Sequence, residues 1–361
     1  MKVIWISGRE IGADLAGTTE VSICEAFGRS GTDCHLISPG SIETTSFKHT
    51  EVRKLNFPGL NTISGAKSVR KMISGEREFK FDAMLVDWRY VFLLRRELMK
   101  LNGPWFIIDR GPPAYAGPLS RLQEIYWKRA WKIAEEFAKG GFVVSDEHER
   151  FIVERLNIDM DIRKVPAGCH PIQELRQKND PVDKLLLAYT GRIDRRRGTK
   201  EIINLTDLLD EMEVPHTVYI AGEGDMHRKI MKQSSQRENL EYLGKLDSGE
   251  IQSLLARCHI GIMPMPNMPI WRIASPLKLS EYLAAGLAII GPSHQGNRLS
   301  GDEIWDLSSE ERDWPLQSIE KIRKTYLRRW QKIVDSAIDS SKKLDWVIIG
   351  EKLIEDLTDL S

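Results

Sequence analysis

Short apolar runs that alternate with longer helical patterns are the feature that most constrains the fold of this chain. In the first half, six such runs lie at residues 2–8, 34–38, 83–88, 105–111, 141–146 and 162–168. In the second half, five more lie at 184–191, 216–222, 240–244, 259–265 and 287–292. Continuously apolar runs are typical of strands that are covered on both faces. The repeated order of strand, loop and helix therefore predicts an α/β chain with parallel, doubly wound sheets.

This pattern is interrupted once, near the middle of the chain. The segment HPIQELRQKNDPVD, at about residues 170–183, is polar and contains two prolines, which is typical of a linker between domains. We therefore predict an N-terminal domain at 1–170, a linker at 171–183, a second α/β domain at 184–315 and C-terminal helices at 316–361. A chain of 361 residues has the length of two ordinary domains.

Composition excludes several classes of partner. The chain has 52 basic and 52 acidic residues, so no overall charge attracts nucleic acid or anionic lipid, and any basic site must be local. No apolar stretch approaches the roughly 20 residues of a membrane span, and the first residues read as a strand rather than a signal peptide. The four cysteines have no zinc-ligand spacing and are expected to be reduced and buried, and the scattered histidines predict no metal site. These features are typical of a cytoplasmic protein.

The segment GRIDRRRGTKE, residues 191–201, is the most basic part of the chain and directly follows an apolar run. Gly191 allows a tight exit from the strand, and four arginines and Lys200 follow within ten residues. Guanidinium groups beside a helix N-terminus suit phosphate. The alternative is a solvated basic turn in which Asp194 pairs with one of the arginines.

The segment SPLKLSEYLAAG, residues 275–286, predicts a helix with clear ends. Ser275 is a natural N-cap, Pro276 suits the first helical position, and Gly286 suits the C-terminal cap. Lys278 and Glu281 share one face and could form an ordinary surface ion pair. However, a lysine in the first turn opposes the helix dipole, which makes more sense if an anion also binds there.

Two glycine-containing loops are weaker signals. The segment IAGEGDMHRKI, residues 220–230, contains a Gly-x-Gly turn but lacks the third glycine of a dinucleotide fingerprint, which favours a plain tight βα turn. The segment GREIGADLAGTTEVSICEAF, residues 8–27, follows the first strand and reads equally well as a ligand loop or as an ordinary connection.

Taken in order, these segments resemble the GT-B glycosyltransferases, and most of all glycosyltransferase family 4. The N-terminal domain ends in VPAGCHP at 165–171, and the next domain opens with GRIDRRRG, in which Arg197 replaces a lysine of the family pattern. The turn GEG at 222–224, the strand end YLG at 242–244 and the helix SPLKLSEYLAAG follow. The segment LDWVIIGEKLIEDL at 344–357 is similar to the family's terminal helix that returns to the N-terminal domain.

This resemblance implies two Rossmann-like domains facing a central cleft, and transfer of a sugar from a nucleotide-diphosphate donor without a metal and with retention. It implies that Arg192, Arg197 and Lys278 bind the diphosphate and stabilise the negative charge that develops on this leaving group. Glu281 would accept hydrogen bonds from ribose. The full implied donor site is Gly191, Gly222, Glu223, Gly224, Ser275, Pro276, Leu277 and Glu281. The acceptor-side candidates are Gly17, Thr18, Asp109, Arg110 and Arg272.

Two departures from the family pattern keep other functions open. Ile273 stands where many relatives have a glutamate that contacts the donor sugar, and the strand end IIDRGPP has no counterpart of a histidine often found near that sugar. An inactive GT-B protein that binds a nucleotide sugar or assists a partner is therefore an alternative. A sugar-nucleotide epimerase with the same fold is another, although its catalytic acids and histidine have no clear place in this sequence.

The expected partners are a nucleotide sugar and a sugar or glycolipid acceptor. The segment LSRLQEIYWKRAWKIAEEF, residues 119–137, mixes aromatic and basic residues at helical spacing. Such a helix either lies on a membrane surface or packs in the domain with a solvated edge. Peripheral contact with the inner face of the membrane is thus one of two interpretations of this segment.

Overall fold

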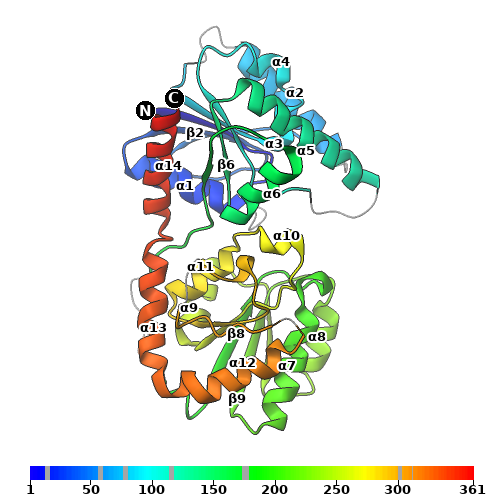
Figure 1. The fold of residues 1–361 in the computed structure, drawn as a ribbon, viewed down its shortest axis with the longest axis vertical. Helices are drawn as coiled ribbons and strands as arrows, with labels where there is room; N and C mark the ends of the chain where they lie inside the picture. The colour runs from blue at the N-terminus through cyan, green and yellow to red at the C-terminus, as the bar shows by residue number, and fades with distance from the viewer. Residues whose placement is uncertain are drawn as a thin grey trace. The chain divides into compact units, whose positions relative to one another are not determined.

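The chain forms two compact α/β units in the computed structural model, which describes residues 1–12, 17–55, 60–75, 80–113, 118–172, 179–299, 303–310 and 312–361 (Figure 1). The first unit consists of Met1–Pro166 with Trp346–Ser361, and the second of Ala167–Asp345. Residues 167–170 thus group with the second unit, although we placed them in the N-terminal domain. Of the predicted linker at 171–183, residues 173–178 lie outside the described residues.

The first unit contains a parallel sheet in the order β3-β2-β1-β4-β5-β6-β7. Its strands are β1 (Lys2–Ile6), β2 (Asp33–Ser38), β3 (Lys48–Glu51), β4 (Ala83–Asp87), β5 (Trp105–Ile108), β6 (Gly140–Val143) and β7 (Ile162–Lys164). Six of these strands begin within a residue of predicted apolar runs. The sequence did not predict β3, because this edge strand, KHTE, is polar and partly exposed.

Two layers of helices cover this sheet. Right-handed crossovers place helices on one face when the chain moves one way across a parallel sheet, and on the other face when it moves back. Accordingly, α1 (Thr18–Arg29) and α14 (Trp346–Leu360) pack together on one side. The other layer contains α2 (Leu60–Gly75), α3 (Trp88–Val91), α4 (Arg95–Leu98), α5 (Pro118–Phe137) and α6 (Asp146–Leu156) (Figure 1). Gly350 lets α14 approach α1 closely, because a Cβ there would lie 2.7 Å from Ala26 Cβ.

The second unit contains a parallel sheet in the order β10-β9-β8-β11-β12. Its strands are β8 (Leu185–Thr190), β9 (His216–Ala221), β10 (Leu240–Gly244), β11 (Ile260–Ile262) and β12 (Ala288–Ile290). Its helices include η2 (Arg195–Arg197), α7 (Thr199–Glu211), α8 (His227–Ser234), α9 (Ser248–Arg257), α10 (Pro269–Arg272), α11 (Leu277–Ala284), α12 (Trp314–Lys321), η4 (Ile322–Tyr326) and α13 (Leu327–Lys342). The two parallel, doubly wound sheets confirm the predicted α/β class.

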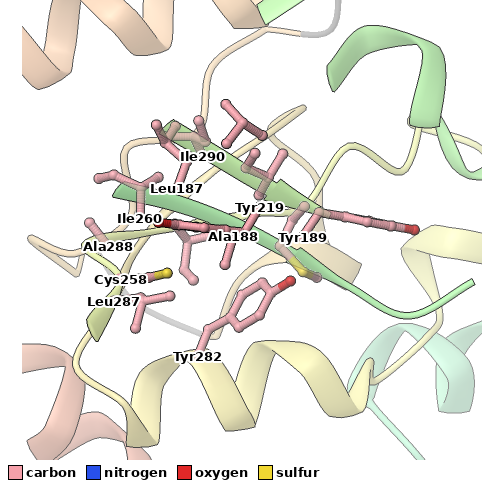
Figure 2. Close-up of a cluster of buried hydrophobic side chains, with 14 of the residues drawn as sticks. Leu187, Ala188, Tyr189, Tyr219, Cys258, Ile260, Tyr282, Leu287, Ala288 and Ile290 are labelled. Atoms are coloured by element: carbon pink, nitrogen blue, oxygen red, sulfur yellow. The ribbon is translucent and has the colours of Figure 1, made fainter. Parts of the chain in front are cut away.

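The core of the second unit holds α11 against the sheet. Figure 2 shows Tyr282 of α11 among the buried side chains beneath β8. Its hydroxyl accepts a hydrogen bond from the backbone N–H of Thr190 at 2.9 Å. Gly261 makes room for this ring, because a Cβ at that position would lie 2.2 Å from Tyr282 Cδ2. Tyr282 therefore fixes the position of α11 relative to the end of β8.

All four cysteines are buried and free, as expected. Within the described parts of the chain, no helix combines the length and the apolar character that crossing a membrane requires.

Candidate functional site

The chain leaves β8 through a tight turn that carries the basic segment. Gly191 has a φ of 119°, a conformation that glycine adopts at little cost, and its N–H donates to Ala221 O at 2.9 Å. The exposed Arg192 donates from Nε to Asp194 Oδ2 at 2.8 Å, and Arg197 Nε lies 3.8 Å from the same oxygen. Burial would raise the pKa of Asp194, but the hydrogen bonds from Arg192 and the backbone lower it. Asp194 therefore pairs with arginine, as the solvated-turn alternative requires.

The chain leaves β9 through the Gly-x-Gly turn, which packs against the turn after β8. A Cβ on Gly222 would lie 1.8 Å from Gly191 O, and a Cβ on Gly224 would lie 2.4 Å from Ile193 O. The backbone N–H of Ile193 donates to Glu223 O at 2.9 Å, whereas the Glu223 side chain is exposed. These contacts explain both glycines by the close approach of two backbones. Donor contacts of Gly222, Glu223 and Gly224 stay a prediction.

The start of α11 differs from our expectation. The N-cap residue is Pro276, which makes no side-chain cap, and the helix begins at Leu277. The Ser275 hydroxyl instead accepts from the backbone N–H of Ala167 at 2.9 Å, so the prediction that Ser275 caps the helix is wrong. Ser280 Oγ donates to Ala167 O at 2.8 Å, which ties the same helix to the same residue. The C-terminal end matches the prediction, because Gly286 has a φ of 68°.

Lys278 is the most informative side chain of this edge of the sheet. It is 8% exposed, and its Nζ lies 4.2 Å from the centroid of the Tyr189 ring. Among the described residues, no hydrogen-bond partner of this Nζ is present. A Cβ on Gly191 would lie 3.6 Å from the Nζ, so the ammonium group lies directly beside the turn after β8. The structure therefore brings Lys278 and Gly191 together.

Burial shifts the protonation of both ionisable groups on this face of α11. It lowers the pKa of Lys278 to about 7, with a further decrease from the charge of Arg197 and a partial offset from Glu281. Burial also raises the pKa of Glu281 to about 7, again with a partial offset from Lys278. Within the described chain, no ion pair joins the two side chains, so the surface-pair alternative is wrong. A buried cation without a hydrogen-bonded anion is costly in free energy.

Three further residues of the second unit lie around α10. The guanidinium carbon of Arg197 lies 5.0 Å from the centroid of the Trp271 ring, which holds this arginine by a cation–π contact. The predicted acceptor-side Arg272 is exposed at the end of α10. Ile273, which occupies the position of the family glutamate, is buried at 5% exposure.

The other acceptor-side candidates lie in the first unit, at the carboxyl ends of β1 and β5. Gly17 is the N-cap of α1 and Thr18 is its first residue. Arg110 donates to Thr19 Oγ1 at 3.2 Å and to the carbonyl of Val165. Burial lowers the pKa of Arg110 to about 10, which Glu20 partly offsets. Contact of these residues with an acceptor stays a prediction.

Asp109 lies next to Arg110 but is fully buried. Its Oδ2 accepts from the indole N–H groups of Trp127 and Trp131 at 2.6 and 3.0 Å, and its Oδ1 accepts from Gly111 N–H at 2.8 Å. His148 Nε2 lies 3.7 Å from Oδ2. These contacts give Asp109 a structural role in holding α5 to the sheet, and its contact with an acceptor is untested.

Sequence reasoning missed three residues that position this edge of the second unit. Tyr189 lies beneath the Lys278 ammonium, Tyr282 anchors α11, and Trp271 holds Arg197. Each acts across a long sequence separation or from a buried strand, and the sequence contains no local signal for such contacts. Among the described residues, no group of three or more His, Cys, Asp or Glu side chains could hold a metal ion.

Comparison with known proteins shows that the part of the second unit that contains these residues matches a family model. Residues 171–299 match the family model described as Glycosyl transferases group 1. Glycogen synthase from Mycobacterium tuberculosis (strain CDC 1551 / Oshkosh) is 26% identical over 136 residues, which are 35% of this chain and 32% of that protein. The match thus spans about a third of the length of that curated relative.

Solved structures match over the whole chain. Sucrose-phosphate synthase from Thermosynechococcus elongatus has a TM-score of 0.79 at 14% identity, with 100% of each chain covered. WaaG, described as a glycosyltransferase involved in lipopolysaccharide biosynthesis, has a TM-score of 0.71 at 14% identity, with 99% of each chain covered. The fold of this chain is therefore that of the GT-B glycosyltransferases, as the resemblance implied. The group 1 family segment contains both GRIDRRRG and SPLKLSEYLAAG.

Proposed function

We propose that this chain is a glycosyltransferase that moves a sugar from a nucleoside-diphosphate sugar to a sugar or glycolipid acceptor, with retention and without a bound metal. The bond between the anomeric carbon and the diphosphate breaks, and a bond from that carbon to an acceptor hydroxyl oxygen forms. The hydroxyl proton passes to an oxygen of the leaving diphosphate, and the nucleoside diphosphate departs. The negative charge that develops on the leaving diphosphate is what the site must stabilise.

The buried Lys278 is the observation that carries this proposal. Its ammonium group lies beside Gly191 at the carboxyl edge of the sheet and has no hydrogen-bonded anion among the described residues. The N-terminus of α11 adds a partial positive charge at the same end. A diphosphate oxygen would satisfy Lys278 and offset the cost of its burial. Arg192 and Arg197 can add to this charge if they turn from Asp194 toward the ligand.

The experiment that tests this function is an assay of nucleoside-diphosphate release with UDP-, GDP- and ADP-sugars, with and without candidate acceptors. We expect one nucleotide to be preferred, and we expect release to persist in EDTA. Nuclear magnetic resonance of the product would report the anomeric configuration. The absence of binding to all three nucleotide classes would contradict the proposal, and loss of activity in EDTA would contradict its metal-independent form.

The low pKa of Lys278 leads to a pH-dependent affinity. With a pKa of about 7 the free lysine is mostly neutral at pH 8, whereas diphosphate binding requires the ammonium form. We therefore expect proton uptake on binding at pH 8, and an affinity for nucleoside diphosphate that falls by up to about tenfold per pH unit above pH 7. The contribution of Glu281 to the affinity has the opposite pH dependence. Its carboxylate form accepts hydrogen bonds better, and the fraction of this form increases with pH.

Calorimetry in buffers of different ionisation enthalpy measures this proton uptake directly. The Lys278→Met variant is the control, because it retains a side chain of similar length without a titrating group. Equal proton uptake in the variant and the wild type would show that another group titrates.

The buried Ile273 supports a second candidate function, which is binding of a nucleotide sugar without transfer. An apolar side chain cannot make the polar contact that the family glutamate provides to the donor sugar. This candidate predicts nucleotide-sugar binding with no release of nucleoside diphosphate for any acceptor. Installing the carboxylate with Ile273→Glu would then restore turnover if this one residue accounts for the inactivity.

A further inference from the structure

The helix layer formed by α2, α4 and α5 in the first unit carries a surface that the proposed chemistry does not use. All three helices cover the same face of the sheet (Figure 1). We define the basic face as the exposed side chains of these three helices and of Met99 and Lys100, which follow α4.

Positive charge is concentrated on this face. The α2 helix contains Lys67, Arg70 and Lys71 and no acidic residue, although the whole chain has as many acids as bases. The α4 helix begins with Arg95 and Arg96, both exposed.

The α5 helix contributes more cations and most of the acids of this face. It carries Arg121, Lys128, Arg129 and Lys132, all exposed. Its acids are Glu124, Glu135 and Glu136, and Glu97 is the acid of α4. Three of these acids form ion pairs: Glu97 with Arg70, Glu124 with Lys128 and Arg155, and Glu135 with Lys132.

The opposite helix layer has the reverse charge. The α1 and α14 helices contain six acidic residues, Glu20, Glu25, Glu351, Glu355, Asp356 and Asp359, but only two basic ones, Arg29 and Lys352. The α6 helix, at the far edge of the basic layer, is also acidic in its first turn. The excess of basic residues in the first unit therefore lies on α2, α4 and α5, whereas α1, α14 and the neighbouring α6 are acidic.

Apolar side chains lie among the cations of the basic face. Leu60, Ile63, Met99, Leu122 and Ile125 are each 46–50% exposed. By contrast, Trp127 and Trp131 of α5 are buried against the sheet, so the aromatic side of this helix is its packing face. The outward side of α5 instead combines leucine and isoleucine with lysine and arginine. This combination is typical of helices that lie in the interface of an anionic membrane.

We propose that the basic face docks the protein on the surface of a membrane that contains anionic lipid. Lysine and arginine would contact the lipid headgroups, and the five apolar side chains would enter the boundary with the acyl chains. Binding to nucleic acid would use the same cations, but it gives no role to half-exposed leucine and isoleucine side chains, so the apolar component favours lipid. This inference does not depend on the proposed glycosyl transfer.

The test is flotation of the full-length protein with vesicles of phosphatidylcholine alone or of phosphatidylcholine with phosphatidylglycerol. We expect partition only into the anionic vesicles, and weaker partition at higher salt. Lys67→Glu/Lys71→Glu should reduce this partition by at least about tenfold, because each cation near an anionic surface increases the affinity for the membrane several-fold. Leu122→Gln/Ile125→Gln should reduce it with little change in salt dependence.

The matched control is Arg323→Glu/Lys332→Glu, which makes the same charge change at exposed positions of the second unit. It should partition like the wild type, and thermal unfolding should show that all variants are folded. Equal partition into both vesicle types, or an equal loss in the control, would overturn the proposal. So would binding of nucleic acid without binding of vesicles. None of these three results would affect the donor assay, which uses no lipid.

Discussion

Replacing Lys278 by methionine should lower kcat/KM for the nucleotide-sugar donor by about 100-fold or more, a loss typical of removing a charged group that stabilises a leaving group. The ammonium group is buried beside the turn after β8 and has no anion of its own within the described chain. Its contribution is therefore expected only when a diphosphate is bound, and it should increase as the leaving group gains charge.

The same substitution should not destabilise the fold. Methionine has nearly the length of lysine, so it fills the space above the Tyr189 ring without introducing a charge. Removing a buried cation also removes its desolvation cost. The expected temperature of unfolding is therefore equal to that of the wild type or higher, which is the opposite of the usual result for a buried residue.

Steady-state release of nucleoside diphosphate and thermal unfolding measure the two effects. Lys332→Met, at an exposed position of α13, is the matched control and should change neither. A kcat/KM within about threefold of the wild type would remove Lys278 from the proposed site. A lower temperature of unfolding would show instead that Lys278 stabilises the empty protein.

The sequence predicted the strands and the main helix of this site well, because local patterns determine them. Continuous apolar runs identified eleven of the twelve strands that the described residues form, and Gly286, which has a left-handed conformation, marked the end of α11. The polar edge strand β3 was missed because an edge strand needs no apolar run. The sequence also showed that the positive charge of Lys278 opposes the dipole of the predicted helix.

The sequence could not predict which polar groups are already satisfied by distant partners. Ser275 reads as a helix cap, but its hydroxyl binds the backbone of Ala167, which is 108 positions away in the sequence. Asp109 reads as a polar residue at a strand end, but indoles from α5 use its carboxylate. Burial of Lys278 also depends on Tyr189 and on the turn after β8, which only the folded sheet brings together.

Asp109→Asn should lower the free energy of unfolding of the first unit by about 3 kcal/mol, as for other buried charged groups that lose their partners. The carboxylate accepts three N–H donors: the two indoles and Gly111. An asparagine has only one carbonyl oxygen. Its NH2 group must therefore point toward either the indoles or Gly111, where a donor would face another donor. At least one buried N–H group would then have no acceptor.

The pKa of Asp109 gives this prediction a pH signature. Burial would raise the pKa, but His148 and the indole donors lower it to about 2. Because the pKa of Asp109 is lower in the folded protein than in the unfolded chain, its ionised carboxylate stabilises the fold above the unfolded pKa of about 4. This stabilisation is lost as the pH falls through the folded pKa of about 2. The wild type should therefore lose part of its advantage over Asp109→Asn as the pH falls from 4 to 2.

Tryptophan fluorescence can follow this unfolding, because Trp127 and Trp131 lie against the carboxylate. Asp146→Asn is the matched control: Asp146 is an exposed acid that pairs with Lys164 at 2.8 Å, and its loss should cost less than about 1 kcal/mol. A Trp131→Phe substitution removes one of the donors, so its cost should not add fully to that of Asp109→Asn in the double variant. Full additivity, or a loss no larger than that of the control, would show that the carboxylate does not hold α5 to the sheet.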